Sequence, residues 1–407
     1  MTYPIPNFRH LRVFVEVAKY QSISKAAPRV FLSQPAITQA IAKLESLLES
    51  ELFERHSDGM YPTAAGKVWC NRIGRCLDYI ERGIREALKN RAGGRPASAQ
   101  QILPLLTTTQ LKAMVAVSGA KNFTLASRNL GVSQSSLHRA ARELEQLLAI
   151  PLFEKTSTGI STTKACQVLA RATKLAFAEI RQGYYEISAL RSREVGRINL
   201  GSMPLARTSI LPEVINRFSA LHPDIGINVV DAPYDGLLQR LREGDLDFLV
   251  GALRFPPPVD DILQEELLAP PLAIVARKGH PLATSTSLDI DTLAEYSWVV
   301  PRIGTPTRTF FDSLFVERGQ STPHRLVETS SQILIRELLR GSDRLTMIST
   351  HQIEHELRLG VLCVLPFSLS HTRRPIGITL RRNWQPTPAQ NQFLDMLRAA
   401  AGRYADL

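Results

Sequence analysis

Four polar or charged side chains in the first sixty residues have types and spacings suited to binding a nucleic acid. Gln34, Thr38 and Gln39 project from the first turns of one predicted helix. Amide and hydroxyl groups in that place can hydrogen-bond base edges in the major groove of DNA. Arg55 follows in a predicted tight turn, Arg55-His56-Ser57-Asp58-Gly59, where a basic side chain suits a phosphate. The pattern predicts base reading by the helix and backbone contact by the turn.

A second group of residues lies at predicted helix starts that follow strands. Gly201-Ser202-Met203-Pro204 ends one strand and opens a helix, and the segment from Arg302 to Thr307 does the same with Pro306 in the first turn. Unpaired backbone N–H groups at such positions attract anions. Plain helix capping by Ser202, Thr305 and Thr307 is the alternative interpretation.

A third pattern, His351-Gln352-Ile353-Glu354-His355, fits the H-x-x-E-H arrangement of inverted zinc peptidases. Those sites need a third ligand, a glutamate further along the chain. No glutamate follows Glu356, and only Asp395 and Asp406 carry carboxylates beyond it. A metal-dependent hydrolase using His351, Glu354 and His355 therefore stays the alternative function, and no metal site or cofactor is expected.

Composition limits the class of protein further. The 407 residues are 44% apolar and 21% charged, as in folded globular chains of two to four domains. Four scattered cysteines form no CxxC pair, and no GxSxG, P-loop or GxGxxG motif occurs, so we expect no zinc ribbon and no enzyme. No apolar stretch approaches 18 residues, which predicts no membrane contact and a cytoplasmic location.

The positive charge lies in the front half of the chain. Residues 1–100 hold 15 Lys and Arg against 9 Asp and Glu, residues 101–195 hold 12 against 6, and residues 196–407 hold 22 against 23. The net charges are thus +6, +6 and −1. A basic front half joined to a neutral back half is typical of a polyanion-binding module attached to a separate domain.

The front half is an internal repeat with an offset of 100 residues. Positions 11–68 match positions 111–168 without a gap, with 19 identities in 58. Each unit is predicted to form a helix (8–20 in the first), a short helix from Ser24, a third helix capped by Ser33, and a hairpin. The residues expected on the apolar side of the third helix are Ala36, Ala40, Ile41, Leu44 and Leu48.

A longer amphipathic helix is predicted after each hairpin. Thr63 caps the first, which we expect to run to about Arg91. Its apolar residues recur at steps of four and three, and the second helix repeats the pattern; the two seams consist of Trp69, Ile73, Cys76, Ile80, Ile84 and Ala87, and of Leu169, Thr173, Ala176, Ile180, Tyr184 and Ile187. Such a seam requires a partner helix. The segment AGGRPASAQ (92–100) between the units has the composition of a flexible linker.

The first unit resembles the winged helix-turn-helix of LysR-type transcriptional regulators. The motifs SQPA, KLE, LFER and TxAG occur in order within SKAAPRVFLSQPAITQAIAKLESLLESELFERHSDGMYPTAAG. The resemblance implies double-stranded DNA as partner, contacted by Ser33, Gln34, Pro35, Thr38, Gln39 and Arg55. It also implies linker helices that join two DNA-binding heads, and hence a homo-oligomer. Two tandem units depart from the family plan of one head per chain.

The second unit keeps the core but changes the reading surface. Thr38 and Gln39 are replaced by His138 and Arg139. We expect Gln134, Arg139 and Lys155 to contact DNA with little base specificity. The alternative is a scaffold that pairs with the first head as an internal pseudo-dimer.

The back half has the alternation of an open α/β sheet. Strands are predicted at RINLGS, INVVDA, DFLVGA, LAIVAR, SWVVP, LTMIS, VLCVLP and IGITL. The segment from Val195 to about residue 280 resembles the LysR effector domain, a two-lobed fold similar to periplasmic binding proteins. By that analogy lobe one is about 196–267 and 360–407, and lobe two is about 268–359. The effector residues expected between them are Ser202, Met203, Arg254, Arg302, Thr305 and Thr307.

The sequence therefore predicts an α and α/β multidomain regulator. The expected domains are a winged helix-turn-helix at 1–64, a linker helix and flexible linker at 65–100, a second winged helix-turn-helix at 101–164, a second linker helix at 165–194, and an effector-binding domain at 195–407. The predicted function is sequence-specific DNA binding controlled by a small organic acid. A DNA-binding protein whose back half binds no ligand is the further alternative.

Overall fold

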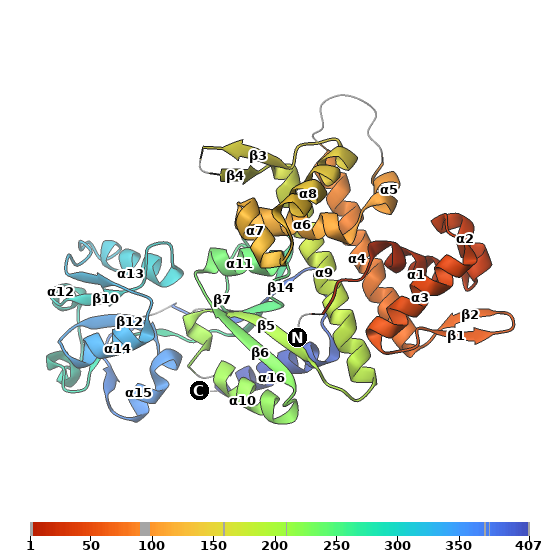
Figure 1. Ribbon diagram of the computed structural model, residues 1–407. Helices are drawn as coiled ribbons and strands as arrows, with labels where there is room; N and C mark the ends of the chain where they lie inside the picture. Colours follow the sequence, from red (N-terminus) through yellow and green to blue (C-terminus); the bar gives the residue numbers. More distant parts are fainter. Residues whose placement is uncertain are drawn as a thin grey trace. The chain divides into compact units, whose positions relative to one another are not determined.

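The computed structural model describes residues 3–89, 98–157, 159–208, 210–369, 372–373 and 375–405 (Figure 1). It divides into two compact units, Met1–Gly196 with Arg242–Asp245, and Arg197–Leu241 with Leu246–Leu407. Each unit has its own hydrophobic core and is described by itself. The segment predicted as a flexible linker lies largely outside the described residues.

The first unit begins with three helices and a two-stranded hairpin. These are α1 (Phe8–Tyr20), α2 (Ile23–Val30), α3 (Gln34–Leu48), β1 (Phe53–His56) and β2 (Gly59–Pro62), followed by the long α4 (Ala64–Leu88). The starts of three helices are fixed by side-chain caps, because Asn7, Ser22 and Thr63 each accept a hydrogen bond from a backbone N–H in the first turn. We call residues 8–62 the first head.

The same order of elements recurs one hundred residues later. After α5 (Ala99–Ile102) and the 3-10 turn η1 (Leu103–Leu105) come α6 (Thr108–Ala120), α7 (Phe123–Leu130), α8 (Gln134–Leu148), β3 (Phe153–Thr156), β4 (Gly159–Thr162) and the long α9 (Lys164–Leu190). A hydrogen bond recurs as well: Glu45 accepts from the backbone N–H of Leu52 at 2.9 Å, and Glu145 accepts from that of Leu152 at 2.8 Å. We call residues 108–162 the second head.

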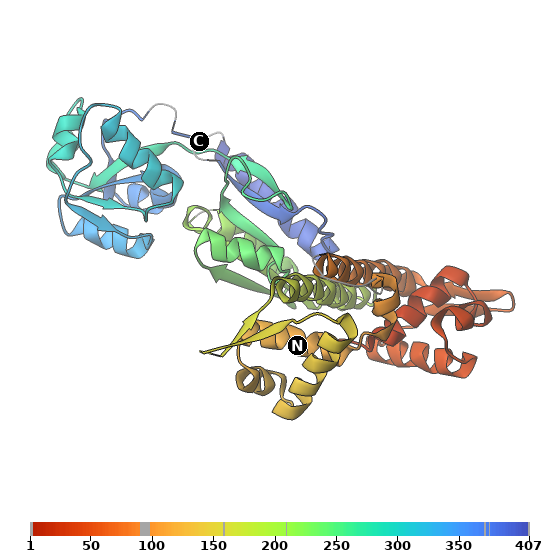
Figure 2. The same ribbon diagram turned by 90° about the horizontal axis from the view of Figure 1, so that it is seen from above.

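The two long helices pack against each other along the predicted seams (Figures 1 and 2). All twelve predicted seam residues are buried. The pairing is antiparallel, because a Cβ at Gly83 would touch Leu169 and Ala172 while a Cβ at Gly183 would touch Trp69. The partner that each seam requires is thus the other helix of the same chain.

The second unit holds two five-stranded sheets. The first has the order β6-β5-β7-β14-β8, from β5 (Gly196–Ser202), β6 (Ile225–Asp231), β7 (Phe248–Ala252), β8 (Ile262–Leu268) and β14 (Ile376–Arg381). Helices α10 (Ile210–Leu221) and α16 (Pro388–Ala405) supply Phe218 and Phe393 to the core on this sheet. Helix α11 (Tyr234–Arg242) closes a smaller apolar cluster.

The second sheet has the order β11-β10-β12-β9-β13, from β9 (Leu272–Arg277), β10 (Trp298–Val300), β11 (Leu326–Glu328), β12 (Leu345–Ser349) and β13 (Leu362–Val364). Its helices are α12 (Ile290–Ala294), α13 (Pro306–Val316), α14 (Gln332–Arg340) and α15 (Glu354–Arg358), with 3-10 turns η3 (Pro281–Thr284) and η4 (Thr350–Ile353). The core contains Trp298 against Phe311 and Phe315.

Two features of this unit differ from the predicted sheet. The eight predicted strands are present, but β8 and β11 were not predicted. Strand β13 pairs with β9, so the chain returns to the first sheet after Val364 and not at about residue 360. In the described part of the chain, no helix is long and apolar enough to cross a membrane.

Candidate nucleic-acid interface and effector site

Helix α3 presents a polar face at its N-terminal end. Gln34, Pro35 and Gln39 are exposed, and Thr38 is half-buried with its hydroxyl donating to the Gln34 carbonyl at 3.1 Å. Ser33 occupies the N-cap position, but its side chain makes no capping bond, which leaves its hydroxyl available. The opposite side of α3 is buried through Ile37 and four of the five predicted residues.

The exception is Ala36, which is only partly buried; Ile37 takes the predicted core position beside Ala40 and Ile41. The buried face of α3 therefore begins one residue later than predicted. The correction leaves the placement of Gln34, Thr38 and Gln39 on the other side unchanged.

The hairpin β1–β2 carries the predicted phosphate contact. Arg55 is exposed in β1 opposite Met60, whose side chain is buried against the head. Beside it, the Tyr61 hydroxyl donates to Asp58 at 2.9 Å, and this hydrogen bond raises the pKa of Tyr61. The hairpin thus holds a cation away from the core on a turn braced by a tyrosine and a carboxylate.

At the positions equivalent to this polar face and hairpin, the second head has a different surface from the first head. His138 stacks on Phe123 with ring centroids 3.7 Å apart, and exposed Arg139 pairs with Glu143 at 2.8 Å. Gln134 is exposed and accepts from the Thr124 hydroxyl at 3.3 Å. Lys155 is exposed on β3. The histidine ring is engaged within the head, so the outward chemistry is that of Arg139 and Lys155.

One exposed residue beside α3 was not predicted from the sequence. Phe31 is 85% exposed in the turn before α3, in the left-handed region at φ 54°. Its counterpart Gly131 occupies the same region at φ 67°. A non-glycine residue in this conformation, next to a helix start, was the available signal.

In the second unit, parallel strands place the predicted effector residues of lobe one at one sheet edge. Strand β5 runs parallel to β7, so Ser202, the last residue of β5, and Arg254, which follows β7, both lie at carboxyl ends of the sheet. Ser202 is fully buried and its hydroxyl donates to the Met203 carbonyl at 3.4 Å. Met203 is buried against Gly251, whose missing Cβ leaves room for it. The Met203 side chain thus belongs to the core of this lobe.

Arg254 lies over the ring of Tyr234 at 4.9 Å, and its backbone N–H and carbonyl both bond Gln264. Burial raises the pKa of Tyr234. The Arg254 guanidinium is therefore held at the edge of lobe one by the Tyr234 ring, and the Arg254 backbone is held by its two hydrogen bonds to Gln264.

The residues predicted from lobe two follow β10, which runs parallel to β12. Arg302 is exposed. Thr305 caps α13, since it accepts from the Arg308 N–H at 3.4 Å and donates to the Arg302 carbonyl at 2.8 Å. Thr307 is half-buried in the first turn. Capping therefore accounts for Thr305, the alternative that the sequence left open.

The helix predicted directly after β5 is absent from the structure. The three-residue 3-10 turn η2 (Pro204–Ala206) follows β5 instead, and α10 begins only at Ile210. The Met203 N–H bonds the Val250 carbonyl, which extends the strand pairing and delays the helix. Of the two helix starts predicted for the effector site, only the one at α13 is the N-terminus of an α-helix.

The segments after β5 and β12 touch each other, which sequence reasoning did not predict. The Thr208 hydroxyl donates to the His351 carbonyl at 3.2 Å. Nearby, Arg207 donates to the Ser202 carbonyl at 2.8 Å and pairs with Asp231. Ser349, fully buried at the end of β12, has a hydroxyl without a hydrogen-bond partner among the described residues. Carboxyl ends from both sheets thus supply polar groups to one region.

The histidines of the H-x-x-E-H pattern do not share one helix. His351 lies in η4, while Glu354 and His355 begin α15. Burial lowers the pKa of His351. Within the described ranges no cluster of three His, Cys, Asp or Glu side chains could hold a metal ion.

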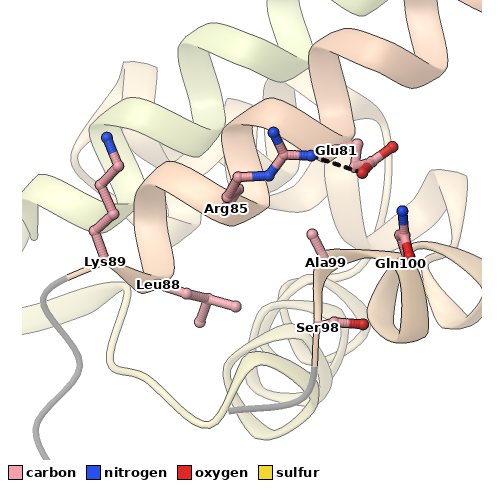
Figure 3. A pocket seen from close by; sticks show the side chains of 7 residues that line it. All are labelled: Glu81, Arg85, Leu88, Lys89, Ser98, Ala99 and Gln100. Atoms are coloured by element: carbon pink, nitrogen blue, oxygen red, sulfur yellow. Dashed lines mark hydrogen bonds and ion pairs between the residues drawn. The ribbon is translucent and has the colours of Figure 1, made fainter.

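A pocket of about 460 Å³ lies between the end of α4 and α5, and none of the residues predicted to bind DNA or an effector lines it (Figure 3). Glu81, Arg85 and Lys89 line one side, and Ser98 and Gln100 the other. The Arg85–Glu81 ion pair at 2.8 Å lies along the α4 side of the pocket, and Arg85 and Lys89 are exposed. The pocket is an open surface hollow.

Two family models match the chain. The LysR substrate binding domain matches residues 191–402, and the model for bacterial regulatory helix-turn-helix proteins of the lysR family matches twice, at 8–67 and 108–167. The two shorter matches coincide with the two heads and the first turn of the helix that follows each.

Known proteins are similar over different shares of the chain. The HTH-type transcriptional regulator GalR of Pseudomonas putida is 34% identical over 394 residues, 97% of each chain. The regulator PcaQ of Agrobacterium fabrum is 28% identical over 296 residues, 73% of this chain but 95% of that protein. A full-length OxyR variant from Pseudomonas aeruginosa has a similar fold, with a TM-score of 0.53, 21% identity and coverage of 73% and 94%.

Proposed function

This chain belongs to the LysR family of DNA-binding transcription regulators and contains an effector-binding domain, and we propose that it reads DNA with two winged helix-turn-helix heads under the control of a small organic acid. The observation that carries this proposal is the exposed polar face of α3 in the first head. Non-enzymatic action fits the relatives, which are transcriptional regulators. Nothing favours the hydrolase alternative.

We propose that the first head supplies the base-specific contact. The exposed amides of Gln34 and Gln39 can pair with base edges, Thr38 adds a hydroxyl oxygen, and Ser33 and Pro35 line the same end of α3. Arg55 on the hairpin is placed for a phosphate. A good bidentate base contact contributes about 1–3 kcal/mol of discrimination, so one residue should control one operator position.

The test is a scan of single base-pair changes in a selected operator against the Gln39→Ala variant. We expect the variant to lose discrimination at one position by about 1–3 kcal/mol, while Arg55→Ala weakens binding to all sequences alike. Ser46→Ala is the matched control, because Ser46 is an exposed polar residue of α3 beyond its first turns. Unchanged discrimination at every position in a Thr38→Ala, Gln39→Ala double variant would refute the assignment of α3.

For the second head we propose phosphate contact with little base specificity. Exposed Arg139 and Lys155 support this, together with Gln134 and the engagement of His138 by Phe123. Each phosphate contact steepens the dependence of log K on log salt by about 0.9. The Arg139→Ala, Lys155→Ala double variant should therefore reduce the slope by about two.

The control for that experiment removes two exposed cations from the effector-binding domain, Lys278→Ala with Arg340→Ala. It should leave the slope unchanged. If the second head were only a scaffold, the Arg139, Lys155 variant would match this control, and its footprint on the operator would equal that of the wild type.

The effector is proposed to be a small carboxylic acid, held between the carboxyl ends of the two sheets. Support comes from the N-terminus of α13 behind Thr305 and Thr307, from the cations Arg254 and Arg302, and from the hydroxyl of Ser202. Met203 supports the site only from the core. Ligands bind beyond the carboxyl ends of strands in open α/β sheets.

A thermal-shift panel of carboxylic acids and their neutral amides tests this. An acid at one hundred times its Kd should stabilise the protein by about 2.7 kcal/mol, which raises Tm by several degrees. Arg302→Gln should reduce the shift, whereas Arg325→Gln, an exposed arginine before β11, should not. Preference for amides over acids would contradict the proposal.

A further inference from the structure

Helices α4 and α9 pair with a symmetry that the 100-residue repeat makes visible. Gly83 contacts Leu169, and Gly183 contacts Trp69. Adding or subtracting 100 converts the first pair of positions into the second. The two helices are therefore related by an approximate twofold axis, as in the isologous interface of a symmetric dimer.

A second observation places the two heads about the same axis. Thr108 accepts a hydrogen bond from the Phe8 backbone N–H at 3.1 Å and donates to the Pro6 carbonyl at 2.8 Å. Phe8 and Thr108 occupy equivalent positions of the repeat. A residue that touches its own counterpart lies next to a twofold axis, so one chain contains both halves of a pseudo-dimer.

The pseudo-dimer is locked by a buried ion network that occurs only once in the described part of α4 and α9. Arg72 binds Glu186 through two nitrogens, Nε at 2.9 Å and Nη2 at 2.5 Å. Its Nη1 donates to Glu179 and Gln182, both at 2.8 Å, and Arg75 holds the other oxygen of Glu179 at 2.9 Å. The Arg72 and Glu179 side chains are only 2% and 5% exposed. The network therefore encloses charge deep between the two helices.

The positions equivalent to this network do not repeat it. Arg72 and Arg75 correspond to Ala172 and Leu175, while Glu179, Gln182 and Glu186 correspond to Tyr79, Arg82 and Glu86. If two α9 helices from different chains paired in this register, their carboxylates would face Ala172 and Leu175 without an arginine. Leaving a buried charge unpaired costs several kcal/mol.

Pairing of two α4 helices is disfavoured for a related reason. Arg72 would then face Tyr79, a second arginine at Arg82, and a single carboxylate at Glu86. Only the combination of α4 with α9 gives Arg72 two carboxylates and an amide oxygen. The side chains thus specify a pair of unlike helices, and because both helices belong to one polypeptide, their pairing is intramolecular.

We propose that one chain supplies a complete pair of DNA-binding heads, locked by Arg72, and that this pair reads an operator with two unlike half-sites. The proposal rests on the DNA-binding function stated above. Each head is followed by the N-terminal end of its long helix, the first head by α4 and the second by α9. The two helices are antiparallel, and their midpoint lies near Cys76 and Ala176. Their N-terminal ends are about 24 residues apart along the pair, or about 36 Å, close to one turn of DNA.

Unlike half-sites follow from the two reading surfaces. The first head has Thr38 and Gln39, whereas the second has an exposed Arg139 and a His138 ring stacked on Phe123 at the equivalent positions. Conventional dimers of identical heads bind palindromes because the two half-sites must match the protein symmetry. In this chain the symmetry is broken where the bases would be read.

The first experiment tests the pairing without DNA. The register places Ala176 opposite Cys76, both fully buried on the axis. Under mild oxidation of the native full-length protein, the Ala176→Cys variant should form a cross-link that migrates as a monomer on a denaturing gel. The same variant with Cys76→Ser should form none. A covalent dimer that depends on the introduced cysteine would overturn the proposal, as would the absence of any cross-link that depends on it.

The second experiment selects bound sequences from random DNA with the full-length protein. We expect one strongly and one weakly defined half-site; scrambling the first lowers affinity at least about a hundredfold, and scrambling the second less than about tenfold. Giving the second head the first head's residues, His138→Thr with Arg139→Gln, should make the half-sites alike. A palindromic consensus for the wild type would refute unlike reading.

The two experiments separate the two ways in which the proposal can fail. If no sequence were enriched, the DNA-binding function would fail while the cross-link still reported the paired heads. If sequences were enriched but the cross-link joined two chains, the function would stand and the single-chain pair would be wrong.

Discussion

Removal of the cation at the centre of the α4–α9 interface should destabilise the first unit more than any exposed substitution. Arg72→Met leaves Glu179 and Glu186 without their main partner in a place where the Glu179 side chain is only 5% exposed. Breaking a buried pair by removing one partner costs about 3–5 kcal/mol. Arg75 still contacts Glu179 at 2.9 Å, which places the expected loss at the lower end, about 3 kcal/mol.

Urea unfolding measures this loss in the free energy of unfolding, provided that a single fluorescent residue reports on the α4–α9 interface. Trp69 is fully buried against Gly183, and the other two tryptophans, Trp298 and Trp384, lie in the second unit. In a background with Phe at positions 298 and 384, Trp69 fluorescence follows the α4–α9 pair. Arg85→Met is the matched control, because Arg85 is 62% exposed and its ion pair with Glu81 should be worth less than about 1 kcal/mol.

A combined variant distinguishes a buried charge from lost packing. Arg72→Met with Glu179→Met and Glu186→Met replaces Arg72 and its two carboxylate partners by apolar side chains of similar size, which is often neutral or stabilising, and it keeps Arg75 and Gln182. We expect it to recover most of the stability that Arg72→Met alone loses. The reasoning is refuted if the single variant costs no more than the Arg85→Met control, or if the triple variant is no more stable than the single one.

Three further outcomes follow from the structure. Gly83→Val should destabilise the first unit by about 1–3 kcal/mol in urea unfolding, because its Cβ would lie 2.4 Å from that of Ala172; Gly74→Val, with open space around its Cβ, isolates the helix-propensity part. Glu45→Gln should cost about 1–2 kcal/mol, because the carboxylate accepts from a backbone N–H; full stability would contradict this. Burial lowers the pKa of His280, so its contribution should be full above the unfolded value and fall as pH drops through about 6.5 and below, and His280→Asn should flatten that dependence in thermal melts.

The repeat and its cores were predictable because local signals and burial agree in both heads. Thr63 caps its helix as the sequence indicates, Thr163 caps the second long helix in the same way, and both seams are buried as their spacing predicts. The ion network was not predictable from periodicity. Arg72 lies within the buried stretch of α4, but nothing local shows that Glu179, more than one hundred residues away, faces it.

The differences in the second unit have separate physical causes. Strand β8 was missed because Glu265 and Glu266 lie in its middle, where an edge strand pairs only with β14. Strand β11 has three residues and shows no periodicity. The helix expected after Ser202 is shortened to a 3-10 turn because Met203 continues the pairing with Val250. These outcomes depend on tertiary pairing, which local propensity does not encode.

Among the candidate site residues, Gln34 and Gln39 on α3 and Arg55 and Lys155 on the hairpins are exposed as expected from the sequence, but Thr38 is half-buried. The sequence could not show that His138 would stack on Phe123, or that Thr208 would bond the His351 backbone across the effector-binding domain. Such contacts join residues that are distant in sequence, and they decide which polar groups stay available to a ligand.

The most direct test of the account is the affinity of the full-length protein for a selected operator and for a scrambled duplex of equal length, at one fixed salt concentration. We predict that the operator is bound at least about a thousandfold more tightly, and that Thr38→Ala with Gln39→Ala removes most of this ratio while Ser46→Ala preserves it. Equal affinity of the wild type for the two duplexes would contradict base reading by the first head.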